Sequence, residues 1–312
     1  MQKQECKIVS LNISEKKGTI KTPRKEINLT SEGIAGDAHA GKWHRQISLL
    51  ADESIKSFES ELGRGINHGE FAENITTLGF PVHKTKPFDR FVCGEVEMEV
   101  TQIGKKCHGD NCEIFQQTGK CVMPTEGIFC RVLNTGKLKE GDILEYRPKT
   151  FRVKVLTLSD RAYEGIYKDK SGLLIEKLSK DWFASQQYRI ETDRSIIPDD
   201  PEMLATELQK AADQQYDIIY TTGSTGIGPR DIAPKIITDF IDIEIPGIMD
   251  MIRLKYGANK PNALLSRSVA GVKAKTLIFS LPGSTKAVHE YLKEIHQILM
   301  HSFMMLHSID SH

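Results

Sequence analysis

From residue 151 onward, the chain alternates between short apolar runs and segments whose apolar residues recur at helical spacing. The runs FRVKVLTLS (151–159), YDIIYTT (216–222) and KTLIFSLPG (275–283) have the length and composition of buried strands. Helices are predicted over 171–183, 201–213, 232–241 and 284–303. Strands that alternate with helices in this way form parallel sheets covered by helices, so we expect an α/β domain here.

The first half of the chain is predicted to be mostly β. Short strand-like runs separated by Gly, Asp and Pro lie at 6–14, 46–51, 91–104 and 141–148. One segment, DESIKSFESELG (52–63), predicts a helix with an acidic start and a glycine stop. Many strands and few helices favour a barrel or a sandwich. We therefore expect two domains, residues 1–148 and 149–312.

Charge and cysteine content narrow the class of protein. Lys and Arg together number 42, as do Asp and Glu, so no basic surface for nucleic acid is expected. The polar N-terminus lacks a secretion signal, and no apolar run is long enough to span a membrane. All six cysteines precede residue 131, without the features of a secreted disulfide scaffold. We expect a reduced, cytoplasmic protein that binds neither nucleic acid nor membranes.

Polar loops follow all three strands predicted beyond residue 151: LTLSDRAYEG (156–165), YTTGSTGIGPRD (220–231) and FSLPGSTKAV (279–288). Parallel α/β sheets bind ligands at the carboxyl ends of their strands. Glycines let backbone N–H groups approach a phosphate, and Asp231 suits a metal ion beside it. An ordinary strand-to-helix turn explains the glycines equally well, because the loop has neither the Walker nor the G-x-G-x-x-G pattern.

TTGSTGIGPRD (221–231) closely resembles the TTGGTGxGxRD segment of the molybdopterin adenylyltransferases and the related Mog, MoaB and gephyrin domains. Further similar segments occur in the same order: SDRAYEGIYKDKSG (159–172), IIPDD (196–200), PGI (246–248), LSRSVAG (265–271) and LPGSTKAV (281–288). The resemblance covers essentially all of 151–312. It implies a three-layer α/β domain and a homo-oligomer, often a trimer in relatives.

The resemblance also implies an activity, the transfer of AMP from ATP to the dithiolene-bearing pterin molybdopterin with release of pyrophosphate. The family's acids fall on Asp199 and Asp231, which would hold Mg²⁺ against the triphosphate. The residues that would bind nucleotide and pterin are Ser159, Asp160, Thr222, Gly223, Ser224, Thr225, Gly226, Gly228, Arg230, Ser266, Arg267, Pro282, Gly283 and Ser284. Asp160 and Arg267 are alternatively an inward-facing structural pair.

Two residues depart from the pattern of these relatives. Ser224 replaces the usual second glycine and adds a Cβ where the backbone needs a positive φ, although its hydroxyl can donate to a phosphate. Ala233 stands where relatives usually carry Thr, which removes a hydroxyl near the start of a helix. We expect Asp231 to cap that helix instead.

In the first half, GIAGDAHAGKWHRQISLL (33–50), GEFAENITTLG (69–79) and CRVLNTGKLKEGD (130–142) resemble the MOSC family. The resemblance implies a β-barrel-like domain that binds molybdenum cofactor or carries sulfur on a cysteine. Cys107 lies where that family commonly has its cysteine, although Gly-Lys-Lys replaces the usual Arg-x-Pro before it. The neighbouring Lys105 and Lys106 favour its thiolate. Asp37 and His39 are either site residues or part of a turn, and Asn74 either belongs to the site or holds a loop.

The two resemblances together predict a bifunctional protein of molybdenum cofactor biosynthesis. Its second domain would bind Mg²⁺, ATP and molybdopterin, and its first would bind molybdenum cofactor or carry sulfur. Other proteins of this biosynthesis are expected as partners. One alternative is a carrier that binds the pterin without adenylylating it. Another makes Cys107, His108, Cys112 and Cys121 the ligands of a structural zinc ion, although their spacing matches no paired C-x₂-C pattern.

Overall fold

The computed structural model describes residues 4–105 and 121–309. The chain divides into two compact units, one up to Lys149 and one from Thr150 onward. Cys107, His108 and Cys112 lie outside the described residues, so both hypotheses that rest on them, the sulfur-carrying cysteine and the zinc module, remain predictions.

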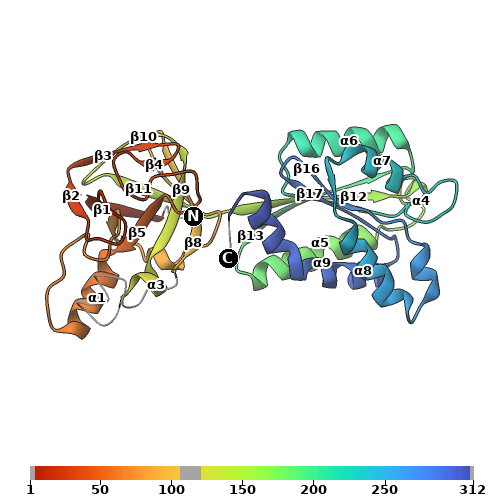
Figure 1. Cartoon of the computed structure of the whole chain (residues 1–312). Coiled ribbons are helices and arrows are strands. Elements are labelled where there is room, and N and C mark those ends of the chain that lie inside the picture. The colour runs from red at the N-terminus through yellow and green to blue at the C-terminus, as the bar shows by residue number, and fades with distance from the viewer. Residues whose placement is uncertain (1–3, 106–120, 310–312) are drawn as a thin grey trace. The chain divides into compact units, whose positions relative to one another are not determined.

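The first unit is a closed barrel of seven strands (Figure 1). Around the ring these strands are β1 (Gln4–Ile13), β11 (Ile143–Arg147), β7 (Arg90–Cys93), β8 (Val96–Ile103), β9 (Ile128–Asn134), β5 (Ile47–Ala51) and β6 (Ile75–Leu78). β6 pairs back with β1 and so closes the ring. Alternate residues of these strands point inward and form one apolar core. The prediction of a barrel is confirmed.

Smaller elements surround the barrel. β2 (Thr22–Arg24) pairs with β1, and β10 (Gly136–Lys139), β3 (Glu26–Thr30) and β4 (Gly33–Ile34) form a second, three-stranded sheet. The helical elements are α1 (Asp52–Leu62), η1 (Val82–Lys84) and α3 (Met123–Glu126). The predicted helix is therefore present as α1, and it ends at Gly63, whose φ of 68° suits a glycine cap.

The second unit is built on a six-stranded, mostly parallel sheet. Its order is β13 (Arg189–Ile197), β12 (Thr150–Leu158), β14 (Ile218–Thr222), β17 (Thr276–Leu281), β16 (Ala270–Lys273) and β15 (Ile243–Glu244). The first four are parallel, and β16 and β15 are antiparallel. The predicted parallel sheet is confirmed. Strands β13, β15 and β16 were not predicted: β13 is an edge strand that alternates exposed charged residues, and the other two are short.

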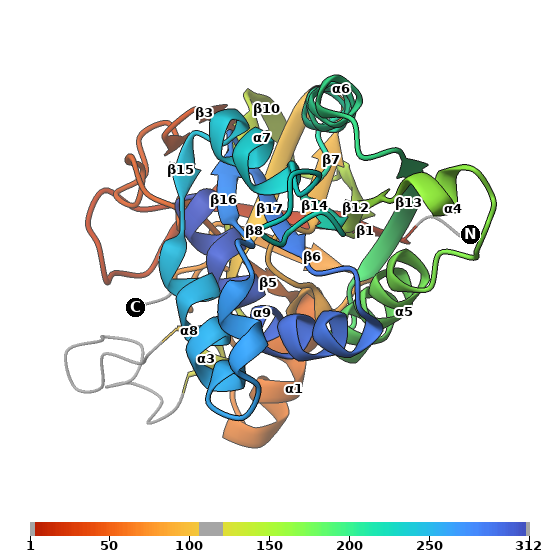
Figure 2. The same ribbon diagram turned by 90° about the vertical axis from the view of Figure 1, so that its right-hand side faces the viewer.

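Helices lie on both faces of this sheet (Figures 1 and 2). On one face, Phe151 of β12 packs against Phe183 of α5 (Ser171–Ser185) and Phe303 of α9 (Thr285–Leu306), with ring centroids 4.9 and 4.7 Å apart. On the other, Leu156 shares an apolar cluster with residues of α6 (Pro201–Asp213) and α7 (Ala233–Phe240). The remaining helical elements are α4 (Asp160–Tyr163), α8 (Pro246–Gly257) and η3 (Pro261–Leu265). No helix in the described parts of the chain is long and apolar enough to cross a membrane.

The contact between α5 and α9 contains a histidine that is kept neutral. The His296 imidazole stacks on the Trp182 ring, with centroids 4.9 Å apart. Its Nε2 atom is buried without a hydrogen-bond partner in the described structure. Burial lowers the pKa of His296 to about 4.

This histidine predicts a pH-dependent stability of the second unit. The folded state favours neutral imidazole, so its contribution is complete above the unfolded pKa of about 6.5 and is lost as pH falls toward 4. Because His296 is not fully buried, we expect a loss of about 2 kcal/mol between pH 7.5 and 4.5. Urea unfolding followed by Trp182 fluorescence in a Trp43→Phe background measures it. His296→Phe should lack this part of the pH dependence, and an identical profile in both proteins would contradict the assignment.

Candidate functional site

Three loops meet at the carboxyl edge of the parallel sheet. β12, β14 and β17 are neighbours, so the segments that follow Leu158, Thr222 and Leu281 emerge side by side. The N–H of Gly223 donates to Leu281 O at 3.0 Å, and the Thr222 hydroxyl donates to Pro282 O at 3.0 Å. The predicted convergence of polar loops is therefore present.

Gly223 is the residue that makes this close approach possible. Its φ is 98°, a region that side chains with a Cβ rarely adopt. A Cβ built there would lie 2.4 Å from Leu158 O, and one built on Gly283 would lie 3.4 Å from the Cα of Gly223. Glycine at 223 is thus required both by its φ and by the neighbouring strand.

Beyond Gly223, the loop folds over the carboxylate of Asp231. Its Oδ2 atom accepts the N–H of Gly228 at 2.7 Å, and a Cβ on Gly226 would lie 2.7 Å from the same oxygen. Oδ1 has no hydrogen-bond partner in the described parts of the chain. The expectation that Asp231 caps α7 is wrong: the N-cap is Ile232, without a side-chain cap, because the Asp231 carboxylate turns back toward the loop.

Ser224 adopts the strained backbone that its position suggested. Its φ is 56°, and its hydroxyl donates to Arg230 O at 2.8 Å while accepting the N–H of Ile232 at 2.9 Å. Its carbonyl accepts the N–H of Ala233 at 3.2 Å. The hydroxyl that was expected to be available to a phosphate is therefore used to close the loop onto α7.

The first loop reaches the same place through Asp160. Its carboxylate forms an ion pair with Arg230, and its Oδ1 atom accepts the N–H of Asp199 at 3.0 Å. The alternative pairing of Asp160 with Arg267 is therefore wrong. Arg230 pairs with Asp160, while Arg267 donates to backbone carbonyls.

Arg267 clamps the glycine loop from its other side. Its Nε donates to Gly226 O and one terminal nitrogen donates to Asp231 O, both at 2.6 Å. Its backbone N–H donates to Thr225 O at 2.9 Å. These bonds fix the backbone on which the Asp231 carboxylate is carried.

The carboxylates of Asp199 and Asp231 lie within electrostatic range of each other. Burial is the main cause that raises the pKa of Asp199, and the negative charge of Asp231 raises it further. Two carboxylates that repel each other at one edge are suited to a shared cation. In the described residues, no group of three or more His, Cys, Asp or Glu side chains is placed to hold a metal. A bound cation would therefore need oxygen ligands from substrate or water.

Two serines at this edge begin helices. The Ser159 hydroxyl accepts the N–H of Ala162 at 3.3 Å and shares a hydrogen bond of 2.7 Å with the Tyr167 hydroxyl. Ser284 caps the long helix α9 by accepting the N–H of Ala287 at 3.2 Å. The positive end of α9 therefore faces the loops, where it favours an anion.

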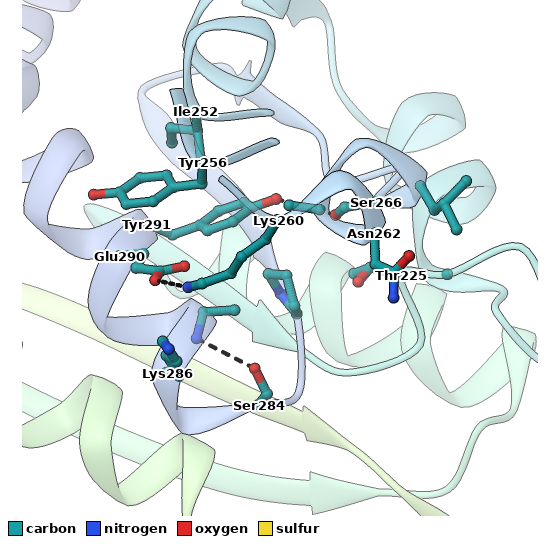
Figure 3. Close-up of a pocket in the computed structure, with 15 residues that line it drawn as sticks. Thr225, Ile252, Tyr256, Lys260, Asn262, Ser266, Ser284, Lys286, Glu290 and Tyr291 are labelled. Carbon is teal, nitrogen blue, oxygen red and sulfur yellow. Dashed lines mark hydrogen bonds and ion pairs between the residues drawn. The ribbon is translucent and has the colours of Figure 1, made fainter. Parts of the chain in front are cut away.

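A pocket of about 360 Å³ adjoins the glycine loop (Figure 3). Its lining includes Thr225 and Gly226 of the loop, together with Pro282 and Ser284 after β17. Asp199 and Asp231 do not line it. Gly226 adjoins both the pocket and the Asp231 carboxylate, so the backbone of the loop connects the two.

The part of the pocket lining that does not come from the glycine loop is aromatic and charged. Tyr256 and Tyr291 lie on one side of it, and Asn262 lies opposite them (Figure 3). Lys260 pairs with Glu290, and the Tyr291 hydroxyl donates to the Ser266 hydroxyl at 3.1 Å. The residues that α8, η3 and α9 contribute here were not predicted, because no motif or spacing distinguishes them from an ordinary helix surface.

In the first unit, three of the predicted site residues lie in one buried network. Asp37 accepts hydrogen bonds from Lys21 Nζ at 2.6 Å and from Asn74 Nδ2 at 3.1 Å. Lys21 Nζ also lies 3.3 Å from His39 Nδ1, and only His39 of this group is partly exposed. Asn74 further bonds the backbone of Ser48 and Asn12, so it holds the barrel together. Lys21 was not predicted, because a lone lysine carries no sequence signal.

Next to this network, two cations approach one indole. Lys17 Nζ lies 5.2 Å and the Arg45 guanidinium 4.9 Å from the centroid of the Trp43 ring, whose Nε1 donates to His39 O at 2.8 Å. Neither cation has a carboxylate partner in the described part of the chain, and Arg45 Nε is buried without an acceptor. Lys17 and Arg45 are therefore suited to bind an anion.

A parallel sheet with a glycine loop and acidic residues at its carboxyl edge defines an α/β domain suited to phosphate-bearing ligands. Residues 154–301 match the family described as "Probable molybdopterin binding domain", and residues 36–145 match the MOSC domain. The chain belongs to this molybdopterin-binding family of molybdenum cofactor biosynthesis, and it carries a MOSC domain before it.

Two curated relatives agree with this assignment, and one solved structure is similar to half of this chain. A molybdopterin adenylyltransferase of Helicobacter pylori is 33% identical over 148 residues, which cover 47% of this chain and 82% of that protein. A molybdenum cofactor biosynthesis bifunctional protein of Synechococcus elongatus is 33% identical over 156 residues, half of this chain and 47% of that protein. The crystal structure of the molybdopterin biosynthesis enzyme MoaB from Thermus thermophilus is 36% identical and covers 50% of this chain and 96% of that one, with a TM-score of 0.45.

Proposed function

We propose that the second unit transfers AMP from ATP to molybdopterin in a Mg²⁺-dependent reaction. The observation that carries the proposal is the meeting of Asp199, Asp231 and the glycine loop at one edge of the sheet. The similarity to named molybdopterin adenylyltransferases supports the substrate assignment.

In this reaction, a phosphate oxygen of molybdopterin attacks the α-phosphorus of ATP. The bond from the α-phosphorus to the α–β bridging oxygen breaks, and pyrophosphate leaves with the electron pair. No protein nucleophile is required, so the protein positions the two phosphates and neutralises their charge. Asp199 and Asp231 would hold the Mg²⁺, which supplies that neutralisation when it is bound.

Residues 222–228 bind the triphosphate in this proposal. The N-terminus of α9 adds its positive end, and Arg230 and Arg267 keep the loop in place. The adjoining pocket takes the pterin, whose flat ring suits a wall made by Tyr256 and Tyr291 and whose polar edge suits Asn262 and Glu290.

Pyrophosphate release with ATP, molybdopterin and Mg²⁺ tests this function. We expect release that needs all three components. A protein that binds molybdopterin but releases no pyrophosphate is instead the carrier considered as the alternative, and that result would overturn the enzymatic proposal.

For the first unit, we propose that it binds the phosphate-bearing cofactor or its precursor. The supporting observation is the pair Lys17 and Arg45 beside Trp43, next to the partly exposed His39. A phosphate group would give the buried Arg45 Nε an acceptor and satisfy two positive charges together.

Inorganic phosphate is the probe for this site, followed by Trp43 fluorescence in a Trp182→Phe background. We expect Arg45→Gln and Lys17→Gln to weaken phosphate binding about tenfold, because each removes a charge-assisted hydrogen bond. Lys42→Gln is the matched control, since Lys42 is exposed in the same loop. An equal loss in the control would mean that only general charge attraction is measured.

We further propose a homo-oligomer, a trimer by analogy with relatives of this family. The support is a group of exposed apolar side chains on α8 and η3: Met251, Leu254, Leu264 and Leu265. Sedimentation equilibrium should give three times the chain mass of 35.1 kDa, whereas a monomer at micromolar concentration would contradict the proposal.

A further inference from the structure

The Ser224 side chain bonds the residues on either side of Asp231, one of the two proposed metal ligands. Its hydroxyl bonds the carbonyl of Arg230 at 2.8 Å and the N–H of Ile232 at 2.9 Å. These residues flank Asp231 directly in the chain, so one side chain grips the backbone on both sides of that carboxylate. The backbone N–H of Asp199 donates to the Asp160 carboxylate, and this carboxylate pairs with Arg230, so the same segment also connects to Asp199.

The backbone of Ser224 adopts an unfavourable conformation in forming these hydrogen bonds. Its φ of 56° is a conformation that glycine adopts freely and that costs a residue with a Cβ about 1 kcal/mol. Glycine would therefore relax the backbone but leave Arg230 O and Ile232 N without this partner. No side chain caps α7 from its N-cap position, so Ser224 also supplies from the loop the acceptor that this helix lacks.

We propose that Ser224 is a positioning residue that fixes the backbone of Asp231 relative to Asp199 and thereby sets the geometry of the cation site. This inference rests on the function proposed above, and it gives the serine hydroxyl a role distinct from binding phosphate. The hydroxyl acts through Asp231 and does not touch the substrate.

Two substitutions that remove the hydroxyl distinguish this positioning role from phosphate binding and from an effect of the backbone conformation. Ser224→Ala keeps the Cβ and the strained φ and loses only the hydroxyl, whereas Ser224→Gly loses the hydroxyl and relaxes the backbone. Binding of an ATP analogue with a methylene α–β bridge is measured by calorimetry, once as its Mn²⁺ complex and once without metal in EDTA. Ser185→Ala is the matched control, because among the residues that the structure describes its hydroxyl bonds only local groups at the end of α5.

We expect both Ser224 variants to bind the Mn²⁺ complex about tenfold more weakly and the metal-free analogue within about twofold of wild type. Amide exchange of residues 224–233 in the protein without ligands should accelerate in both variants, while Ser185→Ala should match wild type in every measurement.

Four results would overturn the inference. Equal weakening of both forms of the analogue would make Ser224 an ordinary phosphate ligand. Full Mn²⁺-complex affinity in Ser224→Gly with a loss in Ser224→Ala would point to the backbone conformation and not to the hydroxyl. Unchanged affinities in both variants would leave the hydroxyl a purely local role. If wild-type protein shows no metal-dependent binding at all, the proposed cation site fails, and this inference fails with it.

Discussion

Asp231→Asn is expected to lower the rate of pyrophosphate release by roughly a thousandfold at saturating ATP and Mg²⁺. The substitution removes one negative charge from the pair that would hold the cation. Asparagine has nearly the same shape, and its amide oxygen can still accept the N–H of Gly228. The loss should therefore appear in catalysis and metal dependence and leave thermal unfolding close to that of wild type.

Asp239→Asn is the control for this prediction. Asp239 lies on α7, its side chain is 60% exposed, and within residues 4–105 and 121–309 its ion pair is with Lys235 alone. The same chemical change there should leave turnover within about twofold, because an exposed ion pair contributes little. Wild-type turnover in Asp231→Asn would show that its charge plays no part in the reaction.

The second large effect is expected from Gly223→Ala. The added Cβ must occupy a φ of 98° and would lie 2.4 Å from the carbonyl oxygen of Leu158 in the neighbouring strand. Neither the backbone nor the buried strand can move without breaking the ladder between β12 and β14. We expect the second unit to lose about 3 kcal/mol of stability, or roughly 10 °C in its Tm by calorimetry.

Gly247→Ala is the matched substitution. Gly247 lies in the first turn of α8 without a positive φ, and nothing lies within 4 Å of the position that a Cβ would take. Alanine there should leave the Tm unchanged or raise it slightly, because it favours the helix. Similar losses in both variants would show that the close approach of β12 to Gly223 does not constrain the loop.

Local signals in the sequence determined most of the fold. Apolar runs identified β12, β14 and β17, because these strands are buried on both faces, and helical spacing identified α5, α6, α7 and α9, because each helix buries one face. The edge strand β13 was not predicted, because it is partly exposed to solvent and its charged residues interrupt the apolar pattern. Strands β15 and β16 are too short for a period to be recognised.

The sequence also determined which loops carry polar and glycine residues, because turn chemistry is local. The tertiary structure alone decided which of those residues meet. It joined Asp160 to Arg230 and turned Arg267 toward the glycine loop. It placed the Ser224 hydroxyl against both peptides of Asp231. It also brought Tyr256, Lys260 and Glu290 into the pocket that the same loop lines. Side-chain partners of this kind depend on distances across the sheet and between helices. Neither a period nor a motif in one stretch of chain encodes those distances.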